Sequence, residues 1–170
     1  LRALPAPGLS VLVNNVGVSY DYPMFFDELT DASVEALTRL NCDSTAHMTH
    51  IALRILKEKQ RGAGGAERRG AIMSVASAAG AFVSPLLSEY SAAKAYVVRL
   101  SQCLAVEYGA KGIDVQATTP AFITTKLAKI RKASLTVPTP ESFARSLCDR
   151  FGYETVTNPN PFHAIMVGFL

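Results

Sequence analysis

The sequence has little of several features that would point to other classes of protein. It contains no tryptophan, only three cysteines and only 18% charged residues in a length of 170. The cysteines are far apart and odd in number, which excludes a disulfide framework and a CxxC metal site. His47, His50 and His163 also lack the spacing of metal ligands, so we expect them to have surface or core roles.

Two further features are absent from the sequence. We find no secretory signal and no apolar run long enough to span a bilayer. The formal net charge of +3 is too small to indicate a nucleic-acid-binding surface, so no nucleic-acid partner is expected. Basic residues are densest at Lys126, Lys129, Arg131 and Lys132, which form either a solvated surface or a contact for an acidic substrate.

The composition that is present is typical of a folded globular domain. Hydrophobic residues make up 49% of the chain, which is ample for a buried core and argues against disorder. The length fits one domain or part of one. The chain begins with Leu1 instead of Met, and it ends inside an apolar stretch, residues 164–170. We expect that both ends are cuts in a longer protein.

Short apolar runs alternate with longer helical patterns, which predicts an α/β fold. We expect strands at residues 10–13, 71–75 and 113–118, and helices at 30–59, 89–108 and 140–151. The first helix should kink near Asn41, and residues 61–70 should form an exposed loop because they are rich in glycine and charge. Right-handed crossovers would make the three strands parallel and adjacent, with a ligand site beyond their carboxyl ends.

Several polar residues fall at that expected edge or on the helices beside it. Tyr90 and Lys94 are four apart, so they share one face of a helix. An ammonium near a phenol stabilises the phenolate, so we expect Lys94 to lower the pKa of Tyr90 and to make it a general acid or base. Ser77, just past a strand, could hydrogen-bond a substrate carbonyl. Asn41 interrupts an apolar helix face, and Asn14 either makes a turn or braces a cofactor.

Together these residues resemble the short-chain dehydrogenase/reductase family. Asn41, Ser77, Tyr90 and Lys94 fall in the order of that family's catalytic tetrad, and the stretch NNVG at residues 14–17 resembles its NNAG turn. The segment PAFITT at residues 120–125 is similar to the family's PGxxxT segment, although alanine replaces the usual glycine.

The resemblance implies specific roles for these residues in NADPH-dependent reduction of a ketone. Tyr90 would donate a proton, Lys94 would bind the nicotinamide ribose, and Ser77 would polarise the substrate carbonyl. Asn41 would hold a water that relays protons to Lys94. The residues expected to contact the cofactor are Asn14, Tyr90, Lys94, Pro120, Ile123 and Thr125.

Longer strings resemble one subgroup, the very-long-chain 3-oxoacyl-CoA reductases and their 17β-hydroxysteroid dehydrogenase relatives. They include YSAAK at residues 90–94, SQCL at 101–104 and TKLAKIRK at 125–132. The resemblance implies an acyl-CoA or steroid substrate, a role in fatty acid elongation, a homodimer and association with the endoplasmic reticulum membrane. The loop at residues 81–83 and the segment after Thr125 could then form an acyl pocket and a lid, with the basic cluster near the CoA phosphates.

The family's glycine-rich pyrophosphate turn is not in this sequence. We therefore expect the C-terminal part of a Rossmann-like, doubly wound parallel sheet, comprising the family's strands 4, 5 and 6. We also expect that the 170-residue chain by itself neither folds well nor binds NADPH. A different reading is a non-catalytic remnant or dimerisation module, although such a protein would have no need of a polar tetrad in one cleft.

Overall fold

The computed structural model describes residues 8–61, 70–125, 127, 128, 130 and 132–168. Four parallel strands form one sheet in the order β1-β2-β3-β4. Their bounds are Val11–Asn14, Gly70–Val75, Ile113–Thr118 and Val156–Thr157. Most of the predicted loop, Lys126, Lys129 and Arg131 of the basic cluster, and both chain ends lie outside the described residues.

The sheet confirms the predicted α/β fold and its three parallel, adjacent strands. Strand β2 lies between β1 and β3, with Val11 opposite Ala71 and Ile72 opposite Val115. Strand β4 was not predicted, because two residues carry no alternation that could reveal a strand. Strand β1 is only half-buried, since Val11 and Val13 are 52% and 55% exposed, whereas β2 is buried along nearly all its length.

The expected kink near Asn41 is a change of helix type. Helix α1 (Asp31–Thr38) leads into a π-helical segment, η2 (Arg39–Asp43), and then into α2 (Ser44–Arg61). The Thr30 side chain caps α1, as predicted, by accepting a hydrogen bond from the Ser33 amide.

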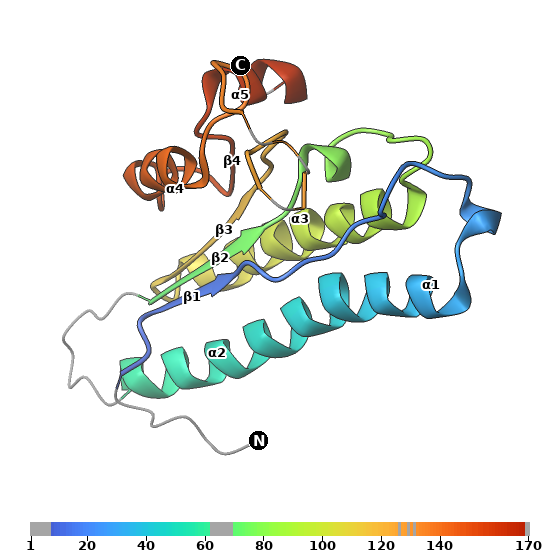
Figure 1. The fold of residues 1–170 in the computed structure, drawn as a ribbon. Helices are drawn as coiled ribbons and strands as arrows, with labels where there is room; N and C mark the ends of the chain where they lie inside the picture. Colours follow the sequence, from blue (N-terminus) through green and yellow to red (C-terminus); the bar gives the residue numbers. More distant parts are fainter. Residues whose placement is uncertain (1–7, 62–69, 126, 129, 131, 169–170) are drawn as a thin grey trace.

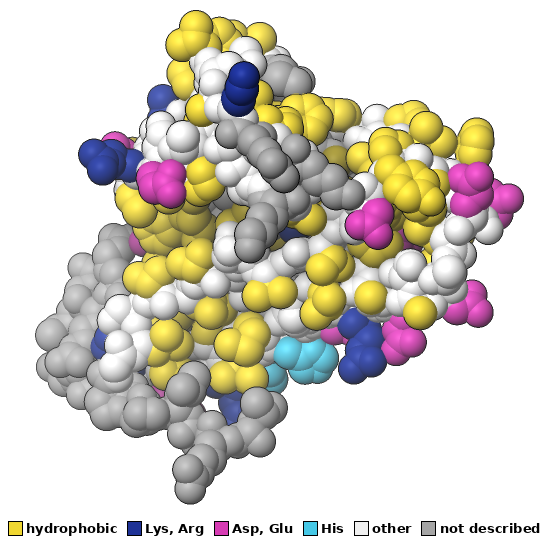
Figure 2. Space-filling model, in the orientation of Figure 1, with side chains coloured by type: hydrophobic (Ala, Val, Ile, Leu, Met, Phe, Trp, Pro, Cys, Tyr) yellow, Lys and Arg dark blue, Asp and Glu magenta, His cyan; other side chains and the backbone are white. Residues whose placement is uncertain are grey.

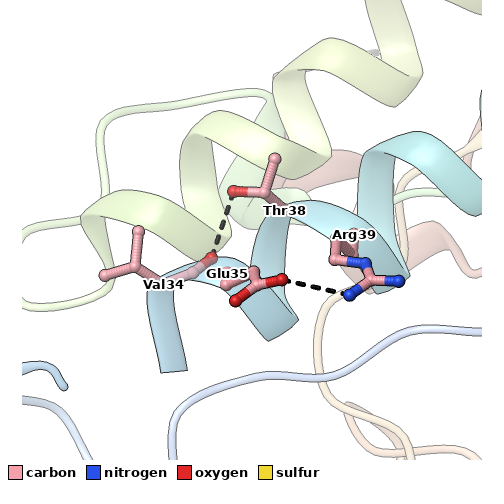
Figure 3. Close-up of polar contacts among 4 residues, drawn as sticks. All are labelled: Val34, Glu35, Thr38 and Arg39. Atoms are coloured by element: carbon pink, nitrogen blue, oxygen red, sulfur yellow. Dashed lines mark hydrogen bonds and ion pairs between the residues drawn. The ribbon is translucent and has the colours of Figure 1, made fainter. Parts of the chain in front are cut away.

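The last turn of α1 carries two local contacts just before the π-helical segment begins. Thr38 Oγ1 donates to the Val34 carbonyl at 3.1 Å, and Arg39 pairs with Glu35 at 3.0 Å (Figure 3). Thr38 Oγ1 also reaches the carboxylate of Glu89 at 2.8 Å, which ties α1 to the first turn of α3 (Ser88–Gly109).

Three more helices complete the fold: α3 (Ser88–Gly109), α4 (Pro140–Asp149) and α5 (Pro161–Val167). Short 3-10 turns lie at η1 (Phe26–Glu28) and η3 (Ala78–Gly80). The long α3 and the α1–η2–α2 unit run side by side along the sheet, and α4 and α5 lie on the other side of the strands from α2 (Figure 1). Helix α5 was not predicted. None of the helices described here is both long and apolar enough to cross a membrane.

Hydrophobic packing occurs on both faces of the sheet. On one face, Ile72 and Val115 pack with Leu53 and Leu56 of α2 and with partly buried residues of α3. Successive strand residues point to opposite faces, so Met73 lies on the other side, where it packs with α4 residues Phe143 and Leu147. The sheet is therefore covered on both sides, as in a doubly wound fold.

Candidate active site

The carboxyl ends of β1, β2 and β3 lie at one edge of the sheet (Figure 1). The predicted polar residues are found at this edge or on the helices beside it. Backbone bonds continue the pairing past the strands. The Ala76 amide donates to Thr118 and the Ala78 amide donates to Pro120, at 2.9 and 2.8 Å. The turn that carries Ser77 is therefore fixed against the segment that follows β3.

Lys94 lies under this edge, on the face of α3 that meets the sheet. Its side chain is only 4% exposed, and Nζ donates to the Val75 carbonyl at 3.0 Å. Burial lowers the pKa of Lys94 to about 8, while the nearby Cys42 opposes part of that change. Lys94 is thus mainly charged at neutral pH, but its burial destabilises the charged form.

Tyr90 lies one helical turn before Lys94, and its ring centroid is 5.7 Å from Nζ. Ser77 lies near its hydroxyl, and Ser77 Oγ accepts from the Ala79 amide at 3.2 Å. Burial raises the pKa of Tyr90, and the Ser77 side chain offsets part of the rise. The prediction that Lys94 lowers this pKa is wrong, since the pKa is raised by desolvation of the phenol and Ser77, not Lys94, offsets part of the rise. The predicted grouping of Ser77, Tyr90 and Lys94 is confirmed.

Asn41 sits in the π-helical segment and is almost fully buried. Its amide nitrogen donates to the carbonyls of Val18 and Leu37, both at 2.9 Å, and its Oδ1 accepts from the Val18 amide at 3.2 Å. The side chain therefore holds the turn after β1 against the helix. The proposed water relay to Lys94 stays a prediction.

Gly17 shows how closely this turn approaches the site. A Cβ there would lie 2.9 Å from Asn41 Oδ1 and 3.0 Å from Lys94 Nζ. A Cβ at these distances would make the ends of both side chains shift, so glycine lets the backbone pass beside the ammonium without displacing it.

Asn14, at the end of β1, uses its amide nitrogen for two bonds inside the protein. It donates to Thr49 Oγ1 at 2.9 Å and to Ser74 Oγ at 3.2 Å. These bonds join β1 to α2 and β2. This bracing of protein elements was not predicted, and the expected contact of Asn14 with the cofactor stays a prediction.

Gly80 is a site residue that sequence reasoning missed. A Cβ at this position would lie 2.4 Å from the carbonyl carbon of Lys94, which is a backbone atom that cannot move aside. Nearby, Ser91 Oγ donates to the Ala79 carbonyl at 2.6 Å. The turn after Ser77 is therefore seated directly on α3. The run of small residues at 78–81 was the available signal.

Beyond Gly80 the loop arches away from α3 and leaves a cavity of about 470 Å³. It is lined by loop residues 80–85 and by Ser88, Ser91, Ala92 and Ala95 of α3. Exposed hydrophobic side chains, Phe82 and Val83 among them, gather where this loop meets the η1 turn (Figure 2). The Met24 amide donates to the Leu86 carbonyl at 3.1 Å and so joins the two segments.

The segment after β3 carries the other predicted cofactor residues. Pro120 is buried and Ile123 packs against the Met73–Phe143–Leu147 cluster. Thr125 Oγ1 accepts from the Ala128 amide at 3.1 Å. All three lie at the same sheet edge as Ser77, but their contact with a nicotinamide stays a prediction.

The donors at this edge fit a nicotinamide ribose. An ammonium and a phenol lie close together beside a turn that has no room for a side chain, and ribose hydroxyls are natural partners for such groups. The described chain offers Tyr90 and Lys94 for this purpose.

Comparison with known proteins decides the family. The model of the short chain dehydrogenase family matches residues 5–135. The chain belongs to the short chain dehydrogenase family. Its curated relatives include very-long-chain 3-oxoacyl-CoA reductases. That of Rattus norvegicus is 42% identical over 160 residues, covering 93% of this chain and 49% of the relative, and that of Homo sapiens is 39% identical with the same coverage. The chain thus spans about half the length of these relatives.

Solved structures of the short chain dehydrogenase family share the fold. A short-chain dehydrogenase from Sphingobium yanoikuyae in complex with NADPH matches with a TM-score of 0.73 and 26% identity, covering 94% of this chain and 61% of that chain. A 3-ketoacyl-(acyl-carrier-protein) reductase from Brucella melitensis, complexed with NADH, matches with a TM-score of 0.75 and 22% identity, covering 90% and 67%. The predicted Rossmann-like architecture is confirmed.

Proposed function

We propose that this chain is the proton-handling half of an NADPH-dependent reductase that converts a 3-oxoacyl-CoA to a 3-hydroxyacyl-CoA. The observation that carries this is the grouping of Ser77 near the Tyr90 hydroxyl with the buried Lys94 beside the phenol ring. The names of the relatives support the acyl-CoA substrate.

NADPH, when bound, supplies the hydride that reduces the ketone carbon. The protein supplies the proton and the positions. Tyr90 donates its phenolic proton to the carbonyl oxygen, and a raised pKa keeps that proton on the phenol until the oxygen becomes basic. Ser77 orients and polarises the same oxygen. Lys94, whose Nζ lies 5.7 Å from the centroid of the Tyr90 ring, binds the ribose of the cofactor.

The cavity beside residues 80–85 supports an acyl chain as the substrate's tail. Its walls are largely apolar or small, and its volume lies within the range of small-molecule sites. The loop that lines the cavity directly follows Ser77, so the same loop positions the cavity and the proposed carbonyl site.

We further propose that the full-length protein acts in fatty acid elongation, as a homodimer associated with the endoplasmic reticulum membrane. The family resemblance supports these assignments. The helical surface formed by α2 and α3 is available for dimerisation, since Met48 and Val106 are exposed on it. Sedimentation of the purified protein and fractionation of cells expressing it test the two assignments separately.

The proposed reaction is tested on the full-length protein by following NADPH oxidation with 3-oxoacyl-CoA substrates. We expect turnover with the wild type and a loss of about 100-fold or more for Tyr90→Phe, which keeps the ring but has no proton to give. NADPH binding by Tyr90→Phe, measured by fluorescence, is the control for folding.

Three results would contradict the proposal. A higher kcat/KM for steroid ketones would favour the 17β-hydroxysteroid dehydrogenase alternative. Dimerisation without turnover of any ketone would favour the non-catalytic module. Full activity of Tyr90→Phe would remove Tyr90 from the reaction.

A further inference from the structure

His163 occupies an unusual place in the fold. It lies in the first turn of α5 and is completely buried. The side-chain oxygen of Asn160 accepts hydrogen bonds from the amides of Phe162 and His163, at 3.0 and 3.1 Å, and Pro161 begins the helix. This cap sets the orientation of the first turn, so the imidazole points into the protein.

Both ring nitrogens of His163 bind backbone atoms far away in the chain. The Ala121 amide donates to Nδ1 at 3.3 Å, and Nε2 lies 3.0 Å from the Thr136 carbonyl. An amide can only donate, so Nδ1 must be unprotonated, and Nε2 carries the hydrogen that it donates to Thr136. One neutral imidazole thus holds both ends of the segment 121–136.

A metal-binding role does not explain this histidine. Within the described ranges, no group of three His, Cys, Asp or Glu side chains could hold a metal ion. The aromatic ring of Phe143 from α4 lies 6.2 Å from the imidazole, centroid to centroid, and packs against it.

The chain just before α5 holds the same segment. The Thr119 amide donates to the Thr157 carbonyl of β4 at 3.1 Å, and Asn158 Nδ2 donates to the Thr119 carbonyl at 2.5 Å. With the bond from Ala121 to His163, three hydrogen bonds from residues 157–163 reach residues 119–121. These residues begin the segment that carries Pro120, Ile123 and Thr125.

We propose that His163 is a positioning residue for the cofactor: it fixes the segment 119–125 in the conformation that receives the nicotinamide. This inference rests on the proposed function. His163 touches no reacting group and acts through the Ala121 amide and the Thr136 carbonyl. The neutral imidazole is needed at the Ala121 contact, because a protonated Nδ1 could not accept from that amide, whereas Nε2 donates to Thr136 in either form.

Two near-isosteric substitutions separate the two contacts. In His163→Asn, the side-chain oxygen takes the place of Nδ1 and can still accept from Ala121. In His163→Gln, the side-chain nitrogen reaches the place of Nε2 and can still donate to Thr136. His163→Phe removes both bonds but keeps an aromatic ring for Phe143. Leu56→Val is the matched control, since it perturbs the buried cluster between α2 and the sheet instead.

The variants are compared in the full-length protein by NADPH affinity, by KM for the ketone, by melting temperature, and by hydrogen exchange of residues 119–125. We expect Gln and Phe to weaken NADPH binding by about tenfold, the effect of losing one buried hydrogen bond, with little change in KM for the ketone. Exchange in residues 119–125 should rise in the same two variants. The NADPH affinity of His163→Asn should stay within about threefold of that of the wild type. Leu56→Val should lower the melting temperature without changing the NADPH affinity.

Other outcomes overturn the inference. If His163→Asn binds NADPH as weakly as His163→Phe, the Ala121 contact does not determine the NADPH affinity. If all three variants lose stability while NADPH affinity and exchange stay unchanged, His163 is merely part of the core. A wild type that binds no NADPH also refutes it. A different result would refute only the proposed substrate. In that case the wild type binds NADPH and the variants rank in affinity as expected, but the protein reduces no 3-oxoacyl-CoA.

Discussion

The two halves of the candidate site are held in different ways. Ser77, Tyr90 and Lys94 are fixed by elements close to them in the chain: one helix, one strand end and one tight turn. The segment 119–125 has no helix or strand of its own and is held from residues 157–163. The first half therefore depends on local geometry. The second half depends on a few hydrogen bonds between residues that are far apart in sequence. Substitutions should consequently damage the two halves in different ways.

The largest effect is expected from Gly80→Ala, which attacks the local geometry of the first half. The added Cβ would lie 2.4 Å from the Lys94 carbonyl carbon, so the turn would have to leave α3. We expect a loss of more than about 3 kcal/mol in unfolding free energy, measured by denaturant titration. The control is Gly109→Ala, where nothing lies within 4 Å. Equal stability of the two variants would contradict the close seating of the turn.

A smaller effect concerns the buried charge of Lys94. Its pKa is lowered from 10.5 to about 8, so the unfolded chain binds more protons than the folded one between these values. Stability contributed by this group must therefore rise as pH increases from about 8 to 10.5. A shift of this size corresponds to about 3 kcal/mol at most.

The measurement for Lys94 is the pH dependence of unfolding free energy in the wild type and in Lys94→Met. We expect the wild type to gain stability relative to Lys94→Met across that range, because the variant has no proton to lose. Parallel curves would show that Lys94 titrates normally.

Gly17→Ala should affect activity more than stability. Its Cβ would press on the ends of the Asn41 and Lys94 side chains, which can shift where backbone atoms cannot. We expect kcat to fall between about tenfold and a hundredfold, with a melting temperature close to that of the wild type. Gly8→Ala, which meets nothing within 4 Å, is the control. An unchanged kcat would mean that the position of Lys94 is less critical than we infer.

The smallest effect is expected from Thr49→Val, which removes one acceptor from Asn14. We expect a loss of about 1 kcal/mol in stability and an unchanged NADPH affinity. Asn14→Ala is the informative partner. If Asn14 also contacts the cofactor, this variant alone should weaken NADPH binding; equal affinities would assign Asn14 to bracing only.

The same contrast explains what could be predicted from the sequence. Tyr90 and Lys94 were predictable because helical spacing places them on one face, and Ser77 because it directly follows a buried strand. The family resemblance added Asn41 and the segment after β3. His163 could not be found as a site residue, because its partners lie 42 and 27 residues away and are backbone atoms without a sequence signature. Gly80 was missed because its constraint comes from the backbone of α3, and β4 because it is too short to show a pattern.

The π-helical segment has a consequence for insertions and deletions. A π turn contains one residue more than an α-helical turn would need. Deleting one residue from 39–43 would thus favour a continuous α-helix in which α1 and α2 keep nearly the same relative orientation. Thr38 would stay beside Glu89, whereas Asn41 would lose the bulged position from which it bonds Val18. The extra residue therefore serves the placement of Asn41, and its removal should affect the turn after β1 more than the packing of α1.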